Sequence, residues 1–311
     1  MKSSAWKLTF GSGLLLAGLM TAVAGPLQRE DVIKDPAWIL HVDVEALRGT
    51  IIGRHLLSAS EQPEVQKKLA AFQTITGIDP HKSVHGFTLY GPTTQAEDGL
   101  LLVYADFDPE RLATLAGGGT DHKTVGHHQH TIHHWIDDKK PAKDGVKPRT
   151  YAAIHGGKII VFGQQQNRVA DALDVLDRVK PNLTLSTDYA SLSLGDGSTF
   201  IQGAARKLEV PASDPNAAIL RQSKMLWLSL GEPRQRVEAA LTLTADSEEV
   251  AQQIEAIGRG LMGLLALQTD KPESVKLAQA LSIQQAGASV TVKLSLPAEE
   301  VVGMIKAKSA E

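Results

Sequence analysis

Pairs of apolar segments, each followed by a polar cap and an amphipathic segment, recur four times along the chain. In the first repeat, Asp108 and Pro109 precede leucines at helical spacing, which is typical of a helix N-terminus. In the second repeat, His155-Gly156-Gly157 separates the two apolar segments and favours a tight hairpin. The pattern therefore predicts four hairpins, each followed by a helix: 84–90 with 100–107, 151–154 with 158–162, 225–230 with 237–244, and 281–285 with 290–296.

Further elements are expected outside these repeats. The pattern predicts a strand over 38–44, a helix over 45–57, a second helix over 62–76 that stops at Gly77, and a strand over 200–205. Strand pairs that return through helices indicate an α+β fold with antiparallel or mixed sheets, rather than a doubly wound nucleotide-binding fold.

The chain is expected to divide into a signal peptide and two lobes. The segment 180–196 contains Pro, Asn and several Ser and Gly residues, which makes it the best candidate for a boundary. We therefore expect a signal peptide at 1–24, an N-terminal α+β lobe at 25–185 and a C-terminal α+β lobe at 186–311, both built from hairpin-plus-helix units. The alternative is a single continuous sheet that spans both halves.

The first 24 residues have the features of a bacterial-type export signal. Lys2 and Lys7 are basic, an apolar run follows over 8–20, and Ala22-Val23-Ala24 provides a small-x-small cleavage site. The mature protein is then expected to begin near Gly25, in the periplasm or outside the cell, with no stable membrane insertion after cleavage. An uncleaved anchor is the alternative, although the apolar run is shorter than the roughly 20 residues of a membrane span.

Composition narrows the class of protein. Apolar residues make up 42% of the 311 residues and charged residues 22%, as in an ordinary globular chain. Removing Lys2 and Lys7 from the 32 basic residues leaves 30 against 35 acidic ones, a net charge of −5, which argues against a nucleic-acid partner. The chain has no cysteine, so disulfides, a thiolate nucleophile and cysteine-ligated zinc are excluded.

One segment departs from this ordinary composition, because six of the 11 histidines lie between 122 and 134. Neutral imidazole binds zinc, nickel or copper, and histidines at i and i+2 on a strand point the same way, as His128 and His130 would. The candidate metal ligands are His127, His128 and His130 with Asp121, or with a carboxylate at 137–138.

Two other interpretations of this segment remain open. It can be a polar, partly exposed hairpin that binds metal only adventitiously, with Ile132 and Ile136 against a core. It can also respond to pH, since several imidazoles in one loop would become charged together near pH 6.

The other motifs in the sequence do not indicate a cofactor or a catalytic site. The sequence 258–263 matches the dinucleotide fingerprint by letter but lies inside a helix expected to begin near Asp246, so no cofactor-binding residues are predicted. Asp43 is placed to cap the helix after its strand, and His41 lies on the same strand face, which favours a structural pair. No nucleophile elbow, Walker loop or calcium loop is present, and catalytic residues stay unknown.

The chain resembles a group of uncharacterised exported bacterial α+β proteins. The resemblance rests on WILHVD at 38–43, a helix reaching Gly53, TGIDP at 76–80 before a hairpin, and LPAEE at 296–300. This group has no established activity, so the resemblance implies the architecture alone. The histidine-rich segment lies outside the shared pattern.

These observations favour an exported, soluble, non-catalytic binding or assembly module, whose partner is an unknown protein or small ligand outside the cytoplasm. The first alternative is a periplasmic transition-metal-binding protein that uses the segment 122–134. A weaker alternative is a hydrolase with a site between the lobes. An enzyme is therefore the less favoured class.

Overall fold

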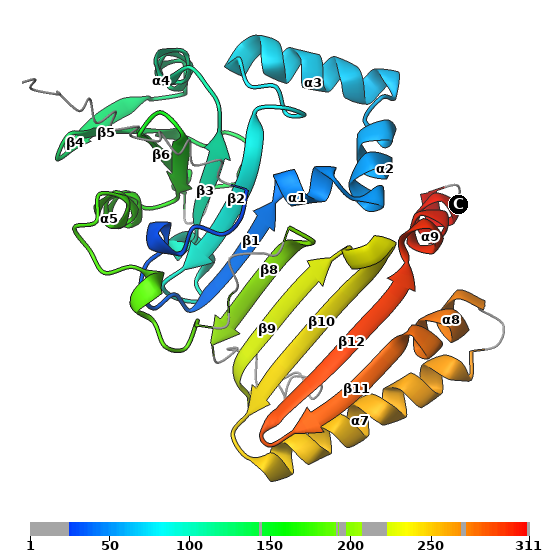
Figure 1. Cartoon of the computed structure of the whole chain (residues 1–311). Helices are drawn as coiled ribbons and strands as arrows, with labels where there is room; N and C mark the ends of the chain where they lie inside the picture. The colour runs from blue at the N-terminus through cyan, green and yellow to red at the C-terminus, as the bar shows by residue number, and fades with distance from the viewer. Residues whose placement is uncertain are drawn as a thin grey trace, which may run out of the picture.

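The computed structural model describes residues 25–142, 145–190, 192, 197–206, 223–268 and 272–309. Within these residues the protein contains one sheet of twelve strands, in which all neighbouring strands are antiparallel (Figure 1). The strands are β1 (Trp38–Asp43), β2 (Val84–Gly91), β3 (Leu100–Ala105), β4 (Lys123–His127), β5 (His130–Ile136), β6 (Arg149–His155), β7 (Ile159–Gly163), β8 (Thr199–Arg206), β9 (Ser223–Gly231), β10 (Arg236–Ala245), β11 (Leu281–Ala286) and β12 (Ser289–Pro297). The predicted signal peptide lies outside the described residues.

The two halves of the sequence occupy separate halves of the sheet. The strand order is β11-β12-β10-β9-β8-β1-β2-β3-β7-β6-β5-β4, so the strands that precede residue 185 are contiguous, as are those that follow it. Hydrogen bonds between β1 and β8 join the halves. The predicted α+β class is confirmed, and the sheet is continuous, as the single-sheet alternative expected. The division into two lobes at 185 stays a prediction.

The four predicted hairpins are present, and each is followed by a helix. The pairs β2–β3, β6–β7, β9–β10 and β11–β12 are hydrogen-bonded neighbours. They precede α4 (Pro109–Gly117), α5 (Gln166–Leu176), α7 (Glu248–Ala266) and α9 (Ala298–Ser309). A fifth hairpin, β4–β5, carries the histidine-rich segment. The sequence did not reveal α8 (Pro272–Ala280), which follows α7.

The predicted helix over 45–57 is divided in the structure. Asp43 accepts a hydrogen bond from the backbone N–H of Ala46 and caps α1 (Val44–Arg48), as expected. Thr50 then caps α2 (Ile51–Ala59), because its hydroxyl accepts from the N–H of Gly53. The expectation of one helix is corrected to two, and the predicted helix over 62–76 corresponds to α3 (Pro63–Thr76).

Helices cover both faces of the N-terminal half of the sheet. Alternation along β3 directs Leu102 into a core that contains Leu173 of α5, and Val103 toward a second core that contains Leu112 of α4. Leu102 and Leu173 are fully buried. The helix α5 is therefore fixed against the sheet, which matters for the site below.

In the C-terminal half, α7 packs against β11 and β12, along one edge of the sheet (Figure 1). The fingerprint-like sequence 258–263 lies inside this helix, as predicted. A Cβ added at Gly258 would lie 2.4 Å from Cδ1 of Ile283, so this glycine allows α7 to approach β11 closely. Its role is packing rather than phosphate binding.

Candidate metal site between the β4–β5 hairpin and α5

The histidines of the β4–β5 hairpin lie at its turn. His127 and His130 are the last pair of the ladder, and His128 and Gln129 form the connection between them. His128 has a φ of 52°, in the left-handed region that a residue with a side chain rarely adopts. The hairpin thus keeps three imidazoles within four consecutive residues at one end of the sheet.

The helix α5 presents two carboxylates to this turn. Asp174 lies in the last turn of α5, and Asp177 is its C-cap residue. Residues three positions apart share one side of a helix, so both carboxylates project in similar directions. Because Leu173 and Leu176 bury the apolar side of α5, the positions of both carboxylates are fixed by core packing.

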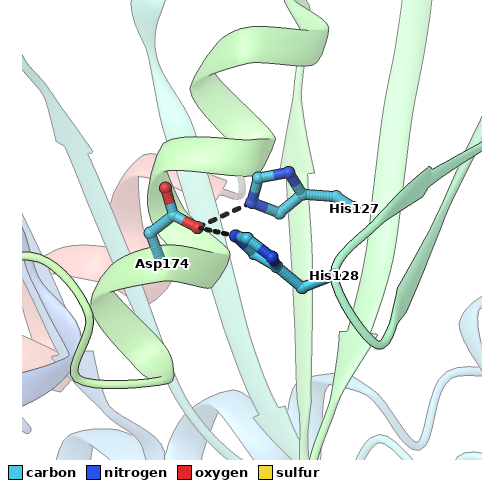
Figure 2. A group of neighbouring side chains, drawn as sticks. All are labelled: His127, His128 and Asp174. Carbon is cyan, nitrogen blue, oxygen red and sulfur yellow. Dashed lines mark hydrogen bonds and ion pairs between the residues drawn. The ribbon is translucent and has the colours of Figure 1, made fainter.

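Asp174 binds the first two histidines of the turn (Figure 2). Its Oδ1 lies 2.6 Å from Nε2 of His127 and 3.5 Å from Nε2 of His128. The Asp174 side chain is 10% exposed, whereas that of His128 is 57% exposed. This first group is thus anchored on the buried side and open to solvent at His128.

Asp177 binds a second pair of histidines, from two different hairpins. Its Oδ2 lies 2.8 Å from Nε2 of His130, and its Oδ1 lies 3.1 Å from Nε2 of His155, at the end of β6. The amide of Gln129 donates a further hydrogen bond to Oδ2. All three side chains of this second group are at most 23% exposed, so it is more enclosed than the first.

Both carboxylates are ionised at neutral pH. Burial by itself would raise the pKa of Asp174, but hydrogen bonds from Lys180 and His127 outweigh burial and lower it. Burial would likewise raise the pKa of Asp177, and the hydrogen bonds from His130 and His155 lower it. Lys180 also binds Asp171, so it bridges two carboxylates of α5.

Each group offers the donor set of an open transition-metal site. Two imidazole nitrogens and one carboxylate oxygen lie within 4.8 Å of one another in each case. A tetrahedral zinc ion with ligands at about 2.0–2.1 Å would hold them roughly 3.3 Å apart. Three protein ligands leave one position for water or a fourth donor. In the described residues, these two groups are the ones with this donor spacing.

The structure divides the predicted ligands. His127 and His128 belong to the first group and His130 to the second, so His128 and His130 do not converge on one carboxylate. Asp121 lies apart from both groups, because its carboxylate binds Arg149 and Lys123.

The other polar residues of the histidine-rich segment have separate partners. His122 and His133 form a hydrogen-bonded, stacked pair. Burial and the nearby His122 lower the pKa of His133. His134 accepts a hydrogen bond from Arg149, and Asp138 binds Lys147.

Three residues of the two groups were missed by the sequence analysis: Asp174, Asp177 and His155. One feature of the sequence could have drawn attention to Asp174. Asp174 stands between Leu173 and Val175 in a run of buried helical positions, where a carboxylate is costly without a partner. Its partners lie 46 and 47 positions earlier in the sequence, so the run itself does not identify them.

No known family model matches the chain, and no curated protein is similar to it in sequence. Among solved structures, crystal form III of TP0453 is similar with a TM-score of 0.49 and 11% sequence identity, and the match covers 91% of this chain and 98% of that one. Crystal form IV of TP0453 gives a TM-score of 0.48 and 11% identity over 91% of this chain and 97% of that one. At this level the likeness carries no functional argument.

Among the helices of the described residues, none is both long and apolar enough to cross a membrane.

Proposed function

We propose that this protein is a non-catalytic binding protein of the cell envelope, and that its ligand is a divalent transition-metal ion such as zinc, nickel or copper. The observation that carries the proposal is the pair of His-His-Asp groups at the end of α5. The predicted export signal and the absence of cysteine agree with it, because a ligand set of imidazoles and carboxylates does not depend on the redox state of the compartment.

The arrangement is suited to reversible binding of an ion. Each group supplies three protein ligands, and the exposed imidazole of His128 gives an ion access from solvent. In the absence of metal, the imidazoles bind the same carboxylates, so the site is already assembled and loses little conformational entropy on binding. Metal binding would displace the imidazole protons that face the carboxylates, so binding should release protons.

The test is calorimetric titration of the chain 25–311 with zinc, at neutral pH and in buffer free of chelators. We expect two ions to bind per chain. Asp174→Asn should abolish one of the two binding events and leave the other, and Asp177→Asn should abolish the other one. His127→Ala removes a ligand of the first group and, like Asp174→Asn, should abolish that binding event and leave the other.

A matched control is available on the same hairpin. The double variant H122A/H133A removes two neighbouring imidazoles that belong to neither group. It should bind two zinc ions with unchanged affinity. Binding that weakens equally in this control and in Asp174→Asn would contradict the proposal, as would the lack of any stoichiometric binding.

The hydrolase alternative stays a prediction. One cavity of about 520 Å³ lies against β8, β9 and β10, and its lining includes Gln202, Trp227, Ser229, Thr242 and Thr244. The residues that line it include no imidazole and no carboxylate. A hydroxyl there lacks the neighbouring base that activates a nucleophile.

A further inference from the structure

The segment that directly follows the predicted signal peptide is built into the core of the protein. Gly25 is buried, and Leu27 is 1% exposed within the main hydrophobic cluster. Val32 and Asp31 continue this path; Asp31 binds Arg178 beyond the end of α5. Gly25, where the mature protein is expected to begin, is therefore itself part of the packed structure.

A buried histidine binds Gly25. Nε2 of His41, in β1, lies 3.0 Å from the carbonyl oxygen of Gly25, and Nδ1 lies 2.8 Å from the hydroxyl of Thr88 in β2. A carbonyl oxygen accepts only, so Nε2 carries the proton that is donated to Gly25. Burial lowers the pKa of His41, which keeps the imidazole neutral and leaves Nδ1 to accept from Thr88. This arrangement fixes the position of the Gly25 carbonyl.

A buried carboxylate faces the α-carbon of Gly25. A Cβ built on Gly25 would lie 3.1 Å from Oδ1 and 3.4 Å from Oδ2 of Asp43, and 3.2 Å from Cβ of Glu45. Glycine is thus the residue that fits at this position without pushing the carboxylate away. The α-nitrogen of Gly25 is bonded to this same α-carbon.

Asp43 lacks a cationic partner among the described residues. Its side chain is buried, with a residue exposure of 6%, and its Oδ1 accepts from the N–H of Ala46 at the start of α1. Among the ion pairs of the described residues, none includes Asp43, whereas the neighbouring Glu45 binds both Arg48 and His85. A buried carboxylate ordinarily has a positive partner.

We propose that the mature N-terminus supplies this partner: hydrolysis of the Ala24–Gly25 peptide bond creates an α-ammonium group that binds Asp43, beside His41 and Glu45. A signal peptidase would cleave the bond with one water molecule, so Ala24 leaves with a carboxylate and Gly25 keeps the amine. The amine is protonated at neutral pH, because its ordinary pKa is about 7.7–8.0. This inference rests on the predicted cleavage site and is independent of metal binding.

The burial of Gly25 also sets the order of signal cleavage and packing. Gly25 is buried and lies against His41 and Asp43, so the proposal requires a protease to cut the preceding bond before this segment packs. Cleavage therefore precedes the final packing of the segment 25–33. Completion of the fold is coupled to export, because the ammonium exists only after the signal is removed.

The test is a double-mutant cycle that measures the coupling between the α-amine of Gly25 and Asp43. The chain that begins at Gly25 is compared with one that retains Ala24, which moves the ammonium by one residue. Both chains are also made with Asp43→Asn, since asparagine keeps the cap of α1 and removes the charge. We expect the retained Ala24 to raise the unfolding equilibrium constant about tenfold with Asp43 present and less than twofold with Asp43→Asn. Equal effects in the two backgrounds would overturn the proposal.

Two further measurements do not require the variants to fold. Mass spectrometry of the protein exported with its own signal should find Gly25 as the first residue; another start would refute the inference. In the native mature chain, the Gly25 amine should react with an acylating reagent at least tenfold more slowly than the amine of an unstructured peptide that begins with glycine. An equal rate would show an unpaired, exposed amine.

Discussion

The substitution Asp177→Asn tests how strongly the second group fastens the β4–β5 hairpin to α5. Asp177 accepts hydrogen bonds from His130, His155 and Gln129, over distances of 2.8, 3.1 and 2.8 Å. Its side chain is 15% exposed. Asparagine has the same shape but one accepting oxygen and no charge, so it can keep only part of these bonds.

The expected loss of stability follows from the number of these hydrogen bonds that asparagine cannot keep. A hydrogen bond to a charged group contributes about 1.5–3 kcal/mol, and the variant loses at least one such bond while the partial exposure weakens the others. We expect Asp177→Asn to lower the free energy of unfolding by about 2 kcal/mol. The assay is urea unfolding at pH 7 in the presence of EDTA, which separates the hydrogen bonds from any metal.

Repeating the assay with zinc adds the contribution of binding. A site at a free zinc concentration 100-fold above its dissociation constant stabilises the fold by about 2.7 kcal/mol. The unmodified chain should gain this amount at each of two sites, and Asp177→Asn at one. The control is Asp171→Asn, whose carboxylate is 37% exposed and binds Lys180; it should change stability in EDTA by less than about 1 kcal/mol. If Asp177→Asn behaves like this control in EDTA, the second group does not hold the hairpin.

Two further outcomes are expected. The pKa values of Asp174 and Asp177 are lowered from 3.8 by folding, so both groups stabilise the fold above that value and lose this contribution as pH falls below it. The stability gap between the native chain and D174N/D177N, measured by urea unfolding, should therefore close with acidification below pH 3.8; a constant gap would contradict it. Gly53→Ala should destabilise the protein by about 3 kcal/mol, because its Cβ would lie 1.8 Å from the carbonyl oxygen of Leu47. Gly260→Ala in α7, with open space around the new methyl group, should be neutral or slightly stabilising in thermal melts; similar losses in both variants would refute this reasoning.

Local signals in the sequence were sufficient for much of the fold. The four hairpins and their helices were predicted because the two strands of each hairpin are successive in the sequence, and because residues such as Asp108 and Asp43 cap the helices that follow them. The division of the predicted helix 45–57 was missed, although Thr50 carries a local capping signal, because the apolar pattern continues through it.

The candidate site was predictable only in part. The sequence shows the cluster that contains His127, His128 and His130, because these residues are neighbours in the chain. It does not show that Asp174, Asp177 and His155 face them, since these residues come from α5 and β6.

By itself, the sequence determined most of the elements, the α+β class and the presence of a histidine-rich hairpin, since each depends on periodicity and on hydrogen bonds between near neighbours. Only the tertiary structure decided that β1 pairs with β8 to make one sheet, and that the hairpin turn meets the end of α5. It also decided that Gly25 lies against His41 and Asp43. The reason is physical: these pairings depend on which distant surfaces bury one another, and no local pattern encodes that choice.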